Sequence, residues 1–223
     1  MPEIPTAKFI GPSEMEKWFV ATAWFSLLAL FCAGYVSFMG LHLWTLQSWS
    51  FITAAVASLL FATSLSIGSF SYYIQWPNVR HGYQKQIGIL AFLVACFYTV
   101  SLPILYPETY WYGLGENLFT ADVIFGGLAM LIFGSMVVGS SRLVASHIKQ
   151  ETVKFILGLG YVGYAFLVIR AILIDWGLWE TWFLTLHGFP PGRLILSVIA
   201  VGVLSLRVSI PVHRLLVNQN SQG

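Results

Sequence analysis

Apolar residues run along this chain in six long stretches, which short polar segments separate. Each stretch is long enough to cross a hydrocarbon layer of about 30 Å as an α-helix. The pattern predicts membrane spans at 18–44, 49–75, 86–106, 118–141, 153–176 and 193–215. The fold class that follows is all-α, a polytopic transmembrane bundle of six helices.

The polar ends of the chain set the expected domain boundaries. We expect a cytoplasmic N-terminal segment at 1–17, the six-helix domain at 18–217 and a polar tail at 218–223. Ser13 and Glu16 have the spacing of a capping box, which satisfies backbone donors at the start of a helix. This box predicts that the first helix opens close to Ser13.

The longest polar break between spans covers residues 177–191, and it is amphipathic and rich in aromatic residues. Such a segment can lie flat in the membrane interface as a short helix. It could instead form a lid or a docking surface for a partner. The flat helix is the interpretation that the pattern favours.

Lysine and arginine are distributed unevenly between the two sides that six spans define. One side collects Lys8, Lys17, Arg80, Lys85, Arg142, Lys149, Lys154, Arg207 and Arg214. The other side has only Arg193, while Arg170 lies within a span. Because cytoplasmic segments carry an excess of lysine and arginine, this asymmetry predicts an integral membrane protein with both termini in the cytoplasm.

Composition agrees with a membrane environment. Hydrophobic residues make up 57% of the 223 residues and charged residues only 9%. A soluble domain has about 25% charged residues, so these side chains cannot cover a water-exposed surface of this size. The lipid bilayer is therefore the expected partner. The net charge of +2 argues against a nucleic-acid partner.

Arg170 and Asp122 are ionisable residues within spans, where such groups are costly and often functional. Arg170 lies about 9 Å below the interface at 1.5 Å per residue, and Asp122 enters the fourth span from the same side at similar depth. They are the main polar candidates, and a pair between them is expected. The pair could fix helix register, and Arg170 could also snorkel, bind an anion or a quinone headgroup, or serve a proton path. Asp175 is expected at the interface, on another face from Arg170.

Three basic residues, Arg207, His213 and Arg214, fall near the cytoplasmic end of the sixth span. They are expected to reach the inner interface among the lipid headgroups, because long basic side chains snorkel toward water. Small residues recur in the second, fourth and fifth spans, and they predict close helix packing.

His42 is the histidine that lies clearly within an apolar stretch. We expect it to donate or accept a hydrogen bond to a neighbouring helix, and metal ligation is the alternative. A transmembrane haem b held by two histidines needs a partner across the bundle, and no other span has a histidine in its middle. No metal site and no cofactor are therefore predicted, although haem b or a quinone stays possible.

Three segments carry a family resemblance. Gln86-Ile-Gly-Ile-Leu-Ala-Phe92 opens the third span, Ser140-Ser-Arg142 ends the fourth, and Tyr161 lies early in the fifth. Over roughly 50–176, this layout resembles the six-helix ferric-reductase-like membrane domain, the type found in the haem-binding partner of methionine sulfoxide reductase.

That family holds haem b on histidines of its third and fifth helices. At the matching places this chain has Tyr98, Leu157 and Arg170, none of which is a usual haem ligand. The resemblance therefore implies a member that has lost haem, in which electron transfer is in doubt.

The sequence leaves three classes of function open. The leading hypothesis is a non-catalytic membrane subunit of a larger assembly, such as a respiratory or other redox complex, with protein partners inside that complex. The alternatives are a small-molecule or ion transporter or channel, and a membrane electron-transfer protein linked to haem or quinone. We find no pattern of catalytic residues, so catalysis by the chain alone is not predicted.

Overall fold

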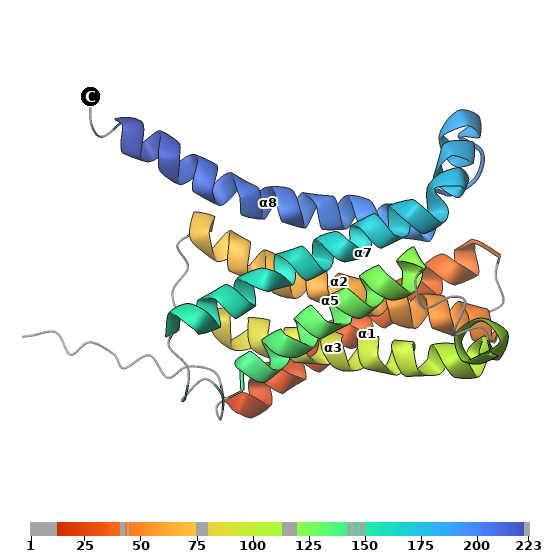
Figure 1. The fold of residues 1–223 in the computed structure, drawn as a ribbon, viewed down its shortest axis with the longest axis horizontal. Coiled ribbons are helices and arrows are strands. Elements are labelled where there is room, and N and C mark those ends of the chain that lie inside the picture. Colours follow the sequence, from red (N-terminus) through yellow and green to blue (C-terminus); the bar gives the residue numbers. More distant parts are fainter. Residues whose placement is uncertain are drawn as a thin grey trace, which may run out of the picture.

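A computed structural model describes residues 13–40, 43, 45–74, 80–112, 120–141, 144, 147 and 150–220 (Figure 1). All regular secondary structure in these described residues is helical, and none of them forms a strand. Its elements are α1 (Glu14–Phe38), α2 (Leu46–Ile74), α3 (Arg80–Leu105), η1 (Glu108–Tyr112), α5 (Ala121–Gly139), α7 (Gln150–Thr185) and α8 (Gly192–Asn220).

All six predicted spans are present as long helices. Within the described residues, α1, α2, α3, α5, α7 and α8 are each long and apolar enough to cross a membrane. The chain is therefore an integral, multi-pass membrane protein, and the predicted all-α bundle is confirmed.

The start of α1 lies four residues earlier than the expected span. The backbone N–H of Glu16 donates to Ser13 Oγ at 3.2 Å, which is one half of the capping box. The Glu16 carboxylate accepts a hydrogen bond from Tyr83 Oη in α3 at 3.3 Å. At the other end, α1 stops at Phe38 and Gly40 takes a φ of +73°, a left-handed conformation that suits glycine after a helix.

The largest difference from the sequence prediction is the length of α7. This helix continues through residues 177–185 to Thr185, where the sequence predicts a separate polar segment. Figure 1 shows that this end of α7 turns away from the direction of the spans. The segment is thus helical, as the favoured interpretation requires, and its position in the membrane interface stays a prediction.

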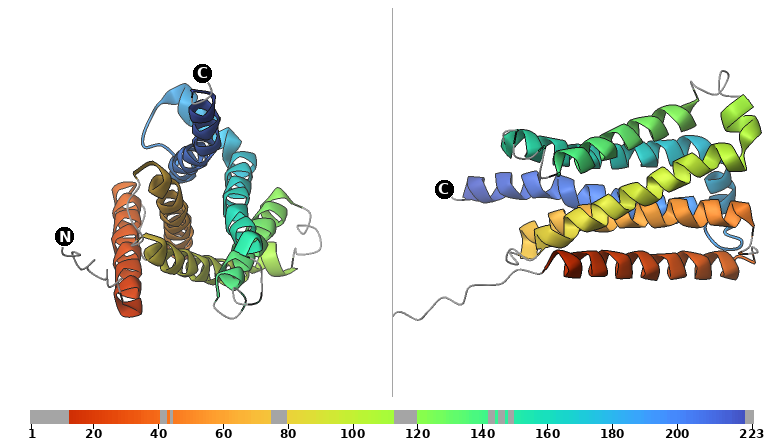
Figure 2. Two further views of the ribbon diagram at one scale, coloured as in Figure 1. Left: turned by 90° about the vertical axis from the view of Figure 1, so that its left-hand side faces the viewer. Right: turned by 90° about the horizontal axis from the view of Figure 1, so that it is seen from below.

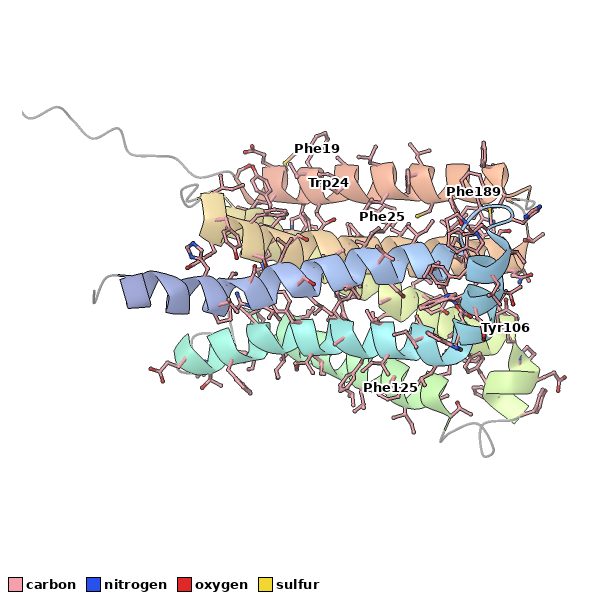
Figure 3. The ribbon with its side chains drawn as sticks, turned by 90° about the horizontal axis from the view of Figure 1, so that it is seen from above. Phe19, Trp24, Phe25, Tyr106, Phe125 and Phe189 are labelled. Carbon is pink, nitrogen blue, oxygen red and sulfur yellow. The ribbon has the colours of Figure 1, made fainter. Side chains whose placement is uncertain are left out.

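The bundle has two ends that differ in what they carry. The start of α1 and the end of α8 lie at one end, which we call the terminal end (Figure 2). At the opposite or distal end, Figure 3 shows Tyr106, which follows the end of α3, and Phe189 from the connection between α7 and α8. Tyr35 Oη donates to the Pro190 carbonyl at 2.6 Å, which ties this connection to α1.

Among the six spans, α2 is the most buried. Seen along their axes, α2, α3, α5, α7 and α8 surround a common centre, and α1 lies outside against α2 and α3 (Figure 2). The helix pairs with the most extensive contact are α2 with α3 and α5 with α7. Because α3 and α5 make much less contact, the centre of the bundle lies between these two pairs.

Aromatic side chains close the middle of the bundle. The rings of Phe61 and Phe133 stack with centroids 3.8 Å apart, which joins α2 to α5. Tyr164 is almost fully buried, and its hydroxyl donates to the Ser58 carbonyl at 3.1 Å. Nearer the terminal end, Tyr161 Oη donates to the Leu65 carbonyl at 2.9 Å. These contacts join α2 to α5 and α7 in the terminal half.

Candidate functional site

The distal half of the bundle contains a cavity of about 560 Å³ between α2, α3, α5, α7 and α8. Its wall is mostly apolar, and many of the side chains are small, among them Ala54, Ala57, Ala95, Gly126, Gly127 and Ala171. Phe61 and Phe133 belong to the same wall, so their stacked rings form the floor toward the terminal end.

Glycines in α5 and α7 differ in how closely their surroundings pack. At Gly163 in α7, an added Cβ would lie 3.0 Å from Ile132 Cγ2, so this glycine permits close packing against α5. At Gly127 in α5, an added Cβ would have no neighbouring atom within 4 Å. The close packing that the sequence predicts for small residues is therefore found at Gly163, whereas Gly127 is an exposed residue of the cavity wall with open space beside it.

The polar group that faces this cavity is centred on Asp122. Arg170 Nε donates to Asp122 Oδ1 at 2.6 Å, and Arg170 Nη2 contacts the same oxygen. Tyr110 Oη donates to Asp122 Oδ2 at 2.7 Å. The side chains of Arg170 and Asp122 are only 21% and 24% exposed. The structure thus brings together the two intramembrane candidates and adds a tyrosine, a group we call the Asp122 cluster.

Three separate elements position the Asp122 cluster. Asp122 lies in the first turn of α5, where the helix dipole favours a negative charge. Arg170 comes from the distal half of α7, and Tyr110 comes from η1. An added Cβ at Gly126 would lie 3.5 Å from Arg170 Nε, an ordinary van der Waals distance, so Gly126 lies directly beside the guanidinium.

Tyr110 is held in its neutral form. Burial raises the pKa of Tyr110 above its ordinary value of 10.0, and the hydrogen bond and negative charge of Asp122 raise the pKa further. The Tyr110 hydroxyl is therefore a fixed donor to Asp122 at physiological pH.

A second ion pair lies at the edge of the cavity. Arg193 Nη1 donates to both carboxylate oxygens of Asp175, at 3.0 and 3.1 Å. Arg193 lines the cavity with a side chain that is 46% exposed, while that of Asp175 is 11% exposed. The expectation that Asp175 faces away from Arg170 and lies at the interface did not foresee this bond to α8.

Two tyrosines belong to the site without having been candidates for it on the basis of sequence. Tyr98 lines the cavity and lies against Arg170, and Tyr110 binds Asp122. Tyrosine at a span end is ordinary in membrane proteins, so nothing in the sequence singles out Tyr110. For Arg193, its isolation as the lone basic residue of its side was a usable signal.

The sequence candidates Arg207 and His213 are not among the residues of the cavity wall. The Arg207 guanidinium carbon lies 5.0 Å from the centroid of the Tyr161 ring, toward the terminal end. His213 Nδ1 lies 3.4 Å from Tyr72 Oη. The side chain of Arg214, and His42 as a whole, lie outside the described residues.

The cavity does not offer the ligands of a haem held by two histidines. Tyr98 and Arg170, which the resemblance places at ligand positions, lie together at the cavity, while Leu157 is 41% exposed. No histidine is among the described residues of the wall, and imidazole is the usual ligand of haem b. The described part of the chain also has no cluster of three metal-ligating side chains. Tyrosine and arginine donors do fit the carbonyl oxygens of a quinone.

Comparison of the chain with protein-family models and with curated proteins finds no match. Its function is therefore inferred from the chemistry of the cavity and not from relatives.

Proposed function

We propose that this chain is a membrane-embedded binding protein for an amphiphilic small molecule. The polar head of the ligand lies at the Asp122 cluster, and its apolar body lies along the small residues of α2, α3 and α5. The observation that carries this proposal is a cavity of about 560 Å³ with an apolar wall and a compact polar group. Ligand sites in proteins typically have this volume and this composition.

A purely architectural role for the ion pair explains less of the geometry. A buried ion pair is expensive to desolvate and adds little net stability. A pair kept only to fix helix register would be expected among well-packed side chains. Here Gly126 lies beside Arg170, and an added Cβ at Gly127, the next residue of α5 in the cavity wall, would have no atom within 4 Å. This arrangement favours a pair that receives a ligand.

Filling the cavity from Gly127 tests the proposal even though the ligand is unidentified. We expect protein purified from native membranes to carry one enriched amphiphile, detected by mass spectrometry of its organic extract. Gly127→Leu places a side chain in the open volume and should remove that species. Gly202→Leu is the matched control, because Gly202 in α8 also has no atom within 4 Å of an added Cβ and lies outside the cavity wall.

An extract with the same amphiphiles in all three proteins would overturn the proposal. Equal folding of the two leucine variants, checked by thermal unfolding in detergent, ensures that a loss of ligand reports on the cavity.

Membership in a larger assembly, such as a redox complex, is a second proposal with its own observation. The end of α7 and the following connection present exposed apolar side chains at the distal end, with Leu184 80% exposed. We expect mild-detergent extracts of native membranes to contain the chain together with partner chains. Leu184→Ser should release them, while Met15→Ser, which alters an 85% exposed side chain at the terminal end, should not. Recovery only as a partner-free chain would contradict this role.

The geometry supports a channel role less well. A channel needs a continuous path from the cavity to the terminal end, and the stacked rings of Phe61 and Phe133 belong to the cavity wall on that side. We therefore do not propose conduction.

A further inference from the structure

Both arginines that line the cavity are already neutralised. Arg170 is paired with Asp122, and Arg193 is paired with Asp175. Asp122, Arg170 and Arg193 are the charged side chains among the described residues of the wall. Because each guanidinium has its own carboxylate, these groups present no net charge to a ligand.

In the Asp122 cluster, the carboxylate oxygens already accept hydrogen bonds, while Arg170 has N–H donors that Asp122 does not engage. Both oxygens of Asp122 accept bonds, Oδ1 from Arg170 and Oδ2 from Tyr110. A guanidinium has five N–H donors, of which Asp122 engages those on Nε and Nη2 of Arg170, and Tyr98 takes part in one further hydrogen bond with Arg170. The cluster therefore retains donors for an oxygen atom of a ligand. Tyr98, which lies against Arg170, adds a hydroxyl to the same region.

An anionic head would be disfavoured at this position. It would lose its hydration and would meet Asp122 as well as Arg170, and an uncompensated charge in a site of low dielectric constant is costly. A carbonyl or hydroxyl oxygen can accept a hydrogen bond from Arg170 without adding charge.

The apolar part of the cavity indicates how long a bound ligand can be. Asp122 and Phe133 are eleven residues apart in α5, which is about 16 Å at 1.5 Å per residue. The wall between them includes Gly126, Gly127 and Ala129, so a chain of carbon atoms can extend from the Asp122 cluster toward the aromatic floor.

We propose that the ligand is an uncharged amphiphile whose head presents a carbonyl or hydroxyl oxygen to Arg170, the chemistry shared by quinones and isoprenoid alcohols. This inference rests on the proposed binding function and names the class of ligand for the same cavity.

Three probes of similar length separate the possibilities. Tritiated decylubiquinone, farnesol and dodecyl phosphate are titrated against the protein in lipid nanodiscs, and binding to Gly127→Leu is subtracted as partition into lipid. We expect saturable binding of decylubiquinone or farnesol to the wild type, at least tenfold tighter than that of dodecyl phosphate. Which of the two uncharged probes binds more tightly distinguishes a quinone from an alcohol.

A second experiment removes the charge of Asp122 and repeats the binding measurements. Asp122→Asn leaves Arg170 without its carboxylate, so the affinity for dodecyl phosphate should rise at least tenfold. Glu16→Gln is the matched control, because it removes one carboxylate at the terminal end of α1 and should leave all three affinities unchanged. An Asp122→Asn protein that folds without this gain would contradict the inference.

The two proposals fail in different ways. Dodecyl phosphate binding the wild type as tightly as the uncharged probes overturns the inference about the head and leaves the binding function standing. Absence of saturable binding by every probe overturns the inference as well. If the extract of the wild type also carries no amphiphile that Gly127→Leu removes, the binding function falls with it. The wild-type titrations decide the question even if Asp122→Asn does not accumulate.

Discussion

Asp122 determines the local structure of the distal end because its carboxylate joins three elements. One oxygen accepts from Arg170 in α7 and the other from Tyr110 in η1, while the residue itself opens α5. Hydrogen bonds to a charged group contribute more than those between neutral groups. The hydroxyl of Tyr110 is therefore expected to matter for stability although this residue lies outside the spans.

Replacing that hydroxyl isolates its contribution. Tyr110→Phe keeps the ring and removes the donor to Asp122, so we expect the free energy of unfolding to fall by about 1.5 kcal/mol. Thermal or denaturant unfolding in detergent measures the change. Tyr112→Phe is the control, since Tyr112 in the same short helix is 75% exposed. Equal stability of the two variants would show that the bond to Asp122 contributes nothing.

The same pair of proteins should differ in their response to alkaline pH. The pKa of Tyr110 is raised in the folded state, so the folded protein holds this proton more tightly than the unfolded chain. The stability that Tyr110 contributes is therefore complete below about pH 10 and declines as the pH rises above that value. Unfolding of the wild type and Tyr110→Phe at a series of pH values should show a constant difference up to about pH 10 and a shrinking difference beyond it.

Among the elements, α7 depends on glycine where it packs against α5. Gly163→Val introduces atoms against Ile132 and Phe133, and overpacking of this kind costs about 1–3 kcal/mol. Gly158→Val is the matched change in the same helix, because Gly158 has no atom within 4 Å of an added Cβ. We expect only Gly163→Val to lower the unfolding temperature. A comparable loss in both variants would indicate an effect of valine on the helix itself.

The helices could be predicted from the sequence much better than the site. Long apolar stretches suffice to define membrane helices, because backbone groups in lipid must be satisfied within the helix. The predicted end of the fifth span, at residue 176, was wrong because α7 continues to Thr185. The amphipathic residues from Gly177 onward look like a break in the apolar pattern, yet the backbone there stays helical.

The candidate site could be predicted only in part. Arg170 and Asp122 stand out because charges within spans are rare. The role of Tyr110 depends on where η1 folds, and the bond between Arg193 and Asp175 depends on how α8 packs beside α7. Neither arrangement leaves a periodic signal in the sequence. The cavity itself is a property of the packed bundle, and small residues such as Gly127 look the same whether they open a space or allow contact.

For the whole molecule, the position of the basic residues predicts its orientation. The six spans bring both ends of the chain to one end of the bundle (Figure 2). We predict that this terminal end faces the cytoplasm, because the described basic residues Lys17, Lys85 and Arg207 lie toward it. Fusion of a reporter that is active only in the cytoplasm should give activity at both termini. Activity at neither would reverse the orientation.

The stacked rings of Phe61 and Phe133 also have a consequence for the cell that makes this protein. They belong to the cavity wall on the side of the terminal end, so we expect an ion that enters the cavity to meet apolar rings there. We therefore expect a membrane rich in copies of the chain to keep its electrical resistance.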